Sequence, residues 1–98
     1  MNDEQLSRTL QSVGQACFVR FFGEFSSNTL SREDIVEKLR AETDYTEGSC
    51  ISLTGHARSI INAGRAEAAL NIIVSSDSAR VSEKTRKDAM QWIQKINS

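Results

Sequence analysis

The sequence predicts an all-α fold, a compact bundle of about five helices in a single domain over residues 1–98. Apolar residues recur at spacings of three and four, and capping residues precede several of these stripes. Proline, which usually punctuates turns and loops, is absent. A chain of 98 residues with 39% apolar and 26% charged side chains suits one soluble globular core.

The first helix is expected over residues 3–22. One face of that helix carries five apolar residues at helical spacing, namely Leu6, Leu10, Val13, Cys17 and Phe21. Gly23 is expected to end it. The four phenylalanines of this region are expected to anchor the core, and the alternative is a partly exposed interface: Phe18, Phe21, Phe22 and Phe25.

The second helix, residues 32–42, has the clearest start signal. Ser31 is a good N-cap, and Asp34 stands at the capping-box position three residues later. Leu30 and Ile35 flank this cap at the positions of a hydrophobic staple. The helix is therefore expected to begin directly after Ser31.

The third helix is expected over residues 46–63. Asp44 or Thr46 caps it, and Asp44 fits the capping-box spacing to Glu47 better. Gly64 is expected to be its left-handed C-cap. Five small or apolar residues share its core-facing side: Cys50, Leu53, Ala57, Ile60 and Ile61. Small residues on the other side suit either a central helix or a helix presented to a partner.

The last two helices are expected over residues 66–75 and 83–97, separated by a polar loop. Ser82 should cap the final helix. Its inner face is expected to consist of Ala89, Trp92, Ile93 and Ile96. Its basic side chains are interrupted by acidic ones and fit a solvated helix face: Lys84, Arg86, Lys87 and Lys95.

Charge is distributed unevenly along the chain, although the net charge is only −1. Residues 1–49 hold five basic and nine acidic side chains, and residues 50–98 hold seven basic and four acidic ones. Opposite charges of this kind can pair within one fold or head-to-tail between copies, and we expect pairing within the fold. The polar start and the lack of a long apolar run predict an intracellular, cytoplasmic protein with no membrane partner.

The residues offer little for catalysis or cofactor binding. His56 is the single histidine, and both cysteines, Cys17 and Cys50, are expected to be free, buried thiols. No Cys-x-x-Cys, histidine pair, calcium-loop spacing or glycine-rich phosphate loop is present. We therefore expect a protein that is not an enzyme and that has no cofactor or metal.

Three short segments resemble the helix-turn-helix of sigma-70-type region 4. They are residues 34–39 (DIVEKL), residues 46–49 (TEGS) and residues 56–58 (HAR), within about 30 of the 98 residues. The resemblance implies that the third helix is a recognition helix. Residues 40–43 add about one helical turn relative to that family, and Ile51 and Leu53 replace basic positions of its groove face.

Two functions follow from the same helix. We expect a small non-catalytic protein-interaction or adaptor module that forms a homodimer. The alternative is a helix-turn-helix DNA-binding regulator. The expected contact residues for either partner are Ser49, Ile51, Ser52, Gly55, His56, Arg58 and Ser59.

Overall fold

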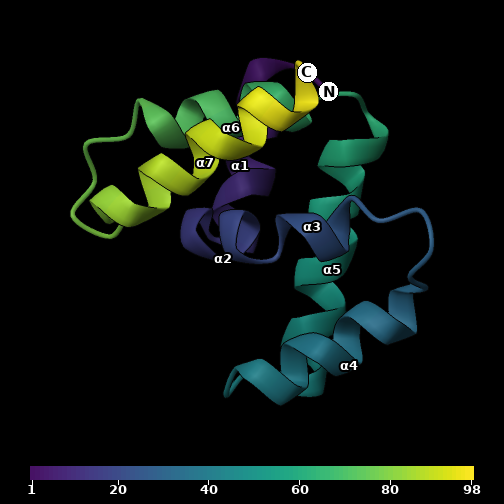
Figure 1. The fold of residues 1–98 in the computed structure, drawn as a ribbon. Helices are drawn as coiled ribbons and strands as arrows, with labels where there is room; N and C mark the ends of the chain where they lie inside the picture. The colour runs from purple at the N-terminus through teal and green to yellow at the C-terminus, as the bar shows by residue number, and fades with distance from the viewer.

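The computed structural model describes residues 1–98 and contains only α-helices and connecting segments (Figure 1). The all-α prediction is confirmed, although the helices number seven and the sequence predicts about five. In chain order they are α1 (Asp3–Val13), α2 (Gln15–Arg20), α3 (Phe22–Phe25), α4 (Arg32–Glu42), α5 (Glu47–Asn62), α6 (Ala66–Val74) and α7 (Glu83–Ile96).

Gly14 divides the predicted first helix, so the expectation of one helix over residues 3–22 is wrong. Gly14 has φ 89° and ψ 128°, a backbone conformation that residues with a Cβ rarely adopt. Its N–H still donates to the carbonyl of Leu10 at 2.9 Å, which closes α1. The chain then changes direction, and α1 packs against α5 while α2 packs against α7.

Gly23 lies inside α3, so the expectation that it ends the first helix is also wrong. The chain turns two residues earlier, at Phe21, and then continues as a helix to Phe25. Glu24, which follows Gly23, avoids the core by pairing with Lys38 of α4, with 3.1 Å between Oε1 and Nζ. Glu24 is the only charged residue of α3. Because its carboxylate pairs with Lys38, the apolar residues of α3 can pack in the core.

The four phenylalanines of α2 and α3 are buried, which confirms that they anchor the core. Each is at most 4% exposed. The rings of Phe18 and Phe22 meet edge to face with centroids 5.5 Å apart, an arrangement that favours the aromatic quadrupoles. Leucines and isoleucines from α1, α4, α5 and α6 complete the same core: Leu6, Leu10, Ile35, Leu39, Ile60, Leu70 and Ile73.

The helix caps follow the sequence closely, with one exception. Ser31 and Asp34 form the expected capping box, each side chain accepting from the other residue's N–H at 3.1 Å. Thr46 caps α5 by accepting from the N–H of Ser49 at 3.1 Å. The preference for Asp44 is wrong, because α5 begins directly after Thr46 and Asp44 lies outside its first turn.

The C-terminal end of α5 confirms the role of Gly64. Gly64 has φ 73°, and its N–H donates to the carbonyl of Ile61 at 3.0 Å. The next N–H, of Arg65, donates to the carbonyl of Ile60 at 3.0 Å. This pair of bonds is the Schellman motif, which satisfies the last carbonyls of a helix.

The loop between α6 and α7 contains one core residue that the sequence analysis did not identify. Val81 is only 4% exposed, although polar residues precede it. Arg86 of α7 holds this loop by donating from Nε to the carbonyl of Ser76 at 2.7 Å. Ser82 caps α7 as expected, accepting from the N–H of Thr85 at 3.1 Å.

The inner face of α7 is shorter than expected. Ala89 is buried and Trp92 and Ile93 are half-buried, but Ile96 is 43% exposed. Ile96 is the final residue of α7, and only a shallow groove beside Ile61 and Ala66 receives it. The prediction that Ile96 belongs to the inner face is therefore wrong.

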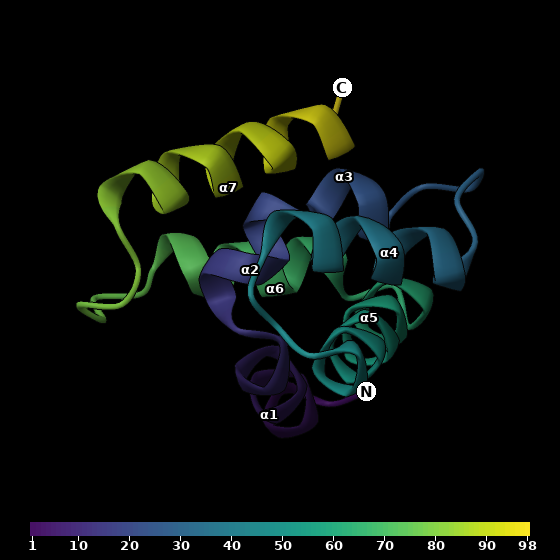
Figure 2. The ribbon, with the colours of Figure 1, turned by 90° about the horizontal axis from the view of Figure 1, so that it is seen from below.

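Helix α5 is central, since it packs against α1, α3, α4 and α6. Figure 1 shows α4 crossing one end of α5, with α6 and α7 at the other end of the molecule. Figure 2 shows α1 and α5 side by side and α7 on a different side of the molecule. None of the helices has the length and apolar character that crossing a membrane requires.

Candidate interaction surface

The seven contact residues predicted from the sequence all belong to α5, on the part of the helix that the core leaves uncovered. Cys50, Thr54, Ala57 and Ile60 are buried on the other side of α5. Ser49, Ile51, Ser52 and Ser59 are exposed, whereas Gly55, His56 and Arg58 are half-buried. Thr54 is fully buried with no hydrogen-bond partner for its hydroxyl, a polar core position that the sequence analysis missed.

The structure divides these seven residues between two sides of α5. Ser49 and Ser52 border a shallow depression that also includes Val13 and Tyr45. Ile51 faces the opposite way, toward α4. Gly55 also lies beside α4, since a Cβ added there would be 3.4 Å from Nη2 of Arg32. The small side chain at position 55 therefore makes room for a side chain of the same molecule.

Arg58 and Ser59 are engaged by the fold itself. Arg58 donates from Nη1 to the carbonyl of Leu30 at 3.5 Å, so its guanidinium is turned toward the segment before α4. Ser59 donates from Oγ to the carbonyl of Gly55 at 3.0 Å, one turn earlier in α5. Arg58 is the only arginine or lysine of α5; it makes no ion pair, and its guanidinium is directed at a backbone carbonyl.

A groove of about 460 Å³ runs between α4 and α5. Val36 of α4 is nearly buried within it, and Ile51 of α5 is 39% exposed beside it. We call this surface the α4–α5 groove; its lining residues are Arg32, Glu33, Val36, Glu37, Arg40, Glu47 and Ile51. It combines one exposed branched apolar side chain with charges of both signs.

The charges of the α4–α5 groove are only partly compensated. Arg40 and Glu47 form an ion pair between the two helices, with 3.8 Å between Nη1 and Oε2. Glu33 and Glu37 are exposed and have no cationic group within ion-pair distance. The groove therefore offers two unpaired carboxylates and one unpaired guanidinium, that of Arg32, on α4 next to Ile51.

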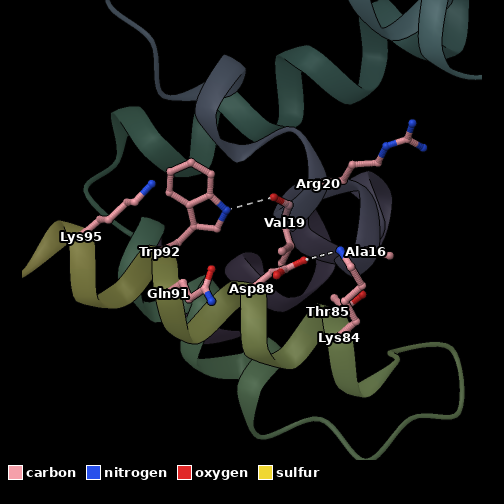
Figure 3. Close-up of a pocket in the computed structure, with 9 residues that line it drawn as sticks. All are labelled: Ala16, Val19, Arg20, Lys84, Thr85, Asp88, Gln91, Trp92 and Lys95. Carbon is pink, nitrogen blue, oxygen red and sulfur yellow. Dashed lines mark hydrogen bonds and ion pairs between the residues drawn. The ribbon is translucent and has the colours of Figure 1, made fainter.

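A second groove, of about 360 Å³, lies between α2 and α7 (Figure 3). We call it the α2–α7 groove; its lining residues are Ala16, Val19, Arg20, Lys84, Thr85, Asp88, Gln91, Trp92 and Lys95. The sequence analysis missed it, because α2 and α7 are distant in the chain. The only indication of this groove in the sequence is the cluster of basic residues in the last helix, which also fits a solvated helix face.

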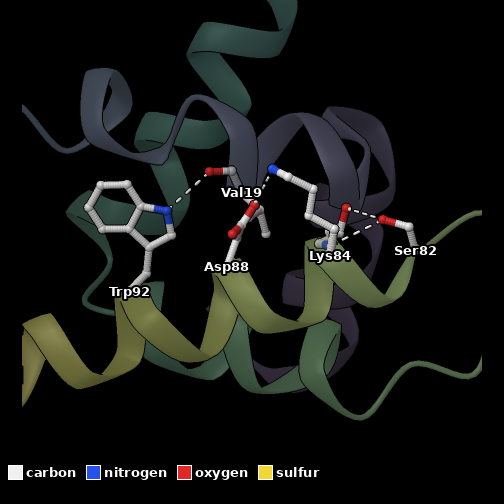
Figure 4. Close-up of polar contacts among 6 residues, drawn as sticks. Val19, Ser82, Lys84, Asp88 and Trp92 are labelled. Atoms are coloured by element: carbon white, nitrogen blue, oxygen red, sulfur yellow. Dashed lines mark hydrogen bonds and ion pairs between the residues drawn. The ribbon is translucent and has the colours of Figure 1, made fainter.

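The α2–α7 groove has a fixed aromatic side chain and cations without carboxylate partners. Trp92 donates from Nε1 to the carbonyl of Val19 at 3.2 Å, while Lys84 pairs with Asp88 at 3.2 Å (Figure 4). Lys95 lies over the Trp92 ring, with Nζ 4.7 Å from its centroid. Arg20 and Lys95 make no ion pair, so the groove has an excess of positive charge.

The thiols lie in the core, as expected from the sequence. Cys17 and Cys50 are free and buried. Burial raises the pKa of the Cys17 thiol to about 11, and the nearby Arg20 guanidinium opposes that rise only in part. A thiol with a raised pKa is a poor nucleophile at neutral pH. The structure gathers no group of three or more histidine, cysteine or acidic side chains suited to a metal ion.

The α4–α5 groove and the α2–α7 groove are two of the surface depressions of this molecule. They differ in charge, since unpaired carboxylates border the α4–α5 groove and unpaired cations border the α2–α7 groove. No family model, curated protein or solved structure matches this chain.

Proposed function

We propose that this protein is a small, non-catalytic protein-interaction module that associates with itself, using the α4–α5 groove as a contact surface. The observation that carries the proposal is the exposure of Ile51 beside the unpaired carboxylates of Glu33 and Glu37. Protein interfaces commonly place an apolar contact within a polar, charged rim. The groove has this arrangement on a surface where no element of the same chain covers Ile51.

The alternative is a helix-turn-helix regulator in which α5 enters the major groove of DNA. Its support is the resemblance of residues 34–58 and the exposed N-terminal turn of α5. Its weakness is charge: residues 31–49 hold three basic and six acidic side chains, and Arg58 is turned toward Leu30. Phosphate neutralisation supplies most non-specific DNA affinity, so a protein partner is the better fit.

Sedimentation equilibrium of the wild-type protein and an Ile51→Lys variant tests the proposal. Ile51 is on the surface, so the variant should keep the helical circular dichroism and the melting temperature of the wild type. We expect it to lose self-association, because a lysine ammonium replaces the apolar contact. Met90→Lys is the matched control, since Met90 is 48% exposed and lines neither groove.

The same variant separates the two functions. On a DNA-binding surface the added lysine should strengthen binding to duplex DNA and steepen its salt dependence, since each phosphate contact releases counterions. A folded Ile51→Lys protein that keeps its oligomeric state and binds duplex DNA more tightly at low salt would overturn the proposal. Wild-type protein that stays monomeric up to millimolar concentration would overturn it as well.

A further inference from the structure

The α4–α5 groove and the α2–α7 groove complement each other, and we infer that copies of this protein associate head to tail, with the α4–α5 groove of one copy on the α2–α7 groove of the next. The inference rests on the proposed self-association and names the surface that fills the groove. Both surfaces belong to the same chain, so no other partner is needed.

Charge is the first argument. Outside its ion pair, the α4–α5 groove is lined by the carboxylates of Glu33 and Glu37 and by the guanidinium of Arg32, a net charge of −1. Outside its own ion pair, the α2–α7 groove is lined by the cations of Arg20 and Lys95, a net charge of +2. The segments that contain α4 and α7 differ in charge in the same direction. Residues 31–49 hold three basic and six acidic side chains, and residues 80–98 hold five basic and two acidic ones. Opposite potentials favour encounter and set the orientation of the partners.

The apolar groups are the second argument. Ile51 is exposed beside the two carboxylates, and Trp92 is half-buried beside Lys95. The Trp92 ring is held in place by its hydrogen bond to Val19 and by Phe22, whose ring centroid is 5.0 Å away. A fixed aromatic ring loses little conformational freedom on binding, and such rings dominate interface energetics.

The position of the grooves is the third argument. Helices α4 and α7 lie at different ends of the molecule (Figure 1). The two grooves of one molecule therefore cannot close on each other. Two different patches that pair between copies form a heterologous contact, which continues into rings or open chains of molecules.

A mixing experiment with two charge-reversed variants tests this arrangement. The first variant is Glu33→Lys with Glu37→Lys, which reverses the α4–α5 groove. The second is Arg20→Glu with Lys95→Glu, which reverses the α2–α7 groove. Each variant keeps one native groove, and the native grooves of the two variants are complementary.

We expect each variant alone to be monomeric by sedimentation velocity, because its two grooves then carry charge of the same sign. We expect the equimolar mixture to associate, because each groove of one variant meets a groove of opposite charge on the other. Variants with the same charge changes outside the grooves should associate like the wild type: Asp44→Lys with Asp77→Lys, and Arg80→Glu with Lys87→Glu. The melting temperature of every variant is measured first. If loss of the Arg20 hydrogen bond to the carbonyl of Glu42 unfolds the second variant, Lys95→Glu alone takes its place.

The outcomes separate the head-to-tail arrangement from self-association as such. If the Arg20→Glu, Lys95→Glu variant associates like the wild type while the Glu33→Lys, Glu37→Lys variant is monomeric, the contact is symmetric through the α4–α5 groove. That result overturns head-to-tail pairing and leaves the proposed function intact. A mixture that remains monomeric although the wild type associates also overturns it. A monomeric wild type contradicts both proposals.

Discussion

The indole N–H of Trp92 donates a hydrogen bond to the backbone carbonyl of Val19 at 3.2 Å and so joins α7 to α2. Val19 stands in the last turn of α2, where helix carbonyls have no partner within the helix. The bond therefore satisfies a buried backbone acceptor and fixes the aromatic ring at the same time.

Trp92→Phe tests this connection. Phenylalanine keeps aromatic contact with Phe22 but removes the donor, and the carbonyl of Val19 loses its hydrogen bond to α7. We expect a loss of about 1–3 kcal/mol in the free energy of unfolding, the cost of an unsatisfied buried polar group. The measurement is chemical unfolding followed by circular dichroism, because Trp92 is the only tryptophan.

Met90→Leu is the control for Trp92→Phe. Met90 lies on the exposed side of α7, and its replacement should change stability by less than about 0.5 kcal/mol. A Trp92→Phe protein as stable as the Met90→Leu protein would show that the hydrogen bond to Val19 contributes nothing to the docking of α7.

Gly23→Ala tests the space that α3 leaves for the indole ring of Trp92. A Cβ at position 23 would lie 3.3 Å from Cη2 of Trp92 and 3.8 Å from Cζ2. The ring is held by Val19 and Phe22, so it cannot move away freely. We expect lower stability and a shift of the Trp92 fluorescence emission to longer wavelength, because the displaced indole gains contact with water.

The control for Gly23→Ala is Gly48→Ala, in the first turn of α5. A Cβ at position 48 would meet no atom within 4 Å. The replacement should stabilise the protein by about 0.5–1 kcal/mol, because alanine loses less backbone entropy than glycine in a helix. An unchanged emission spectrum for Gly23→Ala, with stability gained as at Gly48, would refute the close approach.

Gly14→Ala tests the break between α1 and α2. Alanine at φ 89° and ψ 128° is strained by its Cβ, even though the nearest side-chain atom, Cβ of Cys17, is 3.9 Å away. We expect a loss of about 1–3 kcal/mol, and roughly 4–8 °C in melting temperature for each kcal/mol. A melting temperature equal to that of the wild type would mean that the chain turns elsewhere, with a continuous helix through position 14.

The local features of this fold are readable from the sequence because their causes are local. Ser31, Ser82 and Gly64 act through hydrogen bonds to residues within four positions, and each has the expected role. The apolar stripes likewise identify the core residues of α4, and they identify Cys50, Ala57 and Ile60 in α5, where Leu53 and Ile61 are only half-buried and the buried Thr54 was not predicted. The bounds of α4 are those predicted. The bounds of α5 differ by one residue at each end, and those of α6 and α7 differ by one residue at the C-terminal end.

The features that the sequence does not reveal depend on distant parts of the chain. Gly14 breaks a helix and Gly23 continues one, and the difference at Gly23 arises from Trp92, far along the chain. Val81 is a single apolar residue without periodicity, and its burial depends on the pairing of α6 with α7. The α2–α7 groove could not be predicted for the same reason.

The candidate site was predictable to a limited extent. Ile51 is an apolar residue outside the core-facing stripe of α5, so the sequence identifies it as an exposed contact candidate. The sequence does not reveal that Gly55 accommodates Arg32, or that Arg58 is turned toward Leu30. Both facts depend on how α4 packs against α5, which removes two of the seven residues from the freely accessible surface.

Cys17 gives the stability of the fold a dependence on alkaline pH. Burial raises the pKa of its thiol from 9.0 to about 11 in the folded protein, while the unfolded chain keeps the ordinary value. Between these two pKa values the unfolded state releases the proton and the folded state retains it. The resulting stabilisation is complete below pH 9 and is lost as the pH rises toward 11.

Comparison of the wild type with Cys17→Ala isolates this effect from the titration of tyrosine and lysine. We expect the melting temperature of the wild type to fall more steeply than that of Cys17→Ala between about pH 8 and about pH 10.5, because alanine does not titrate. A thiol reagent at neutral pH should label Cys17 and Cys50 only after denaturation, since both are buried. Parallel pH profiles for the two proteins, or rapid labelling of the native wild type, would show that the Cys17 thiol reaches solvent; this would contradict its place in the core beside α5.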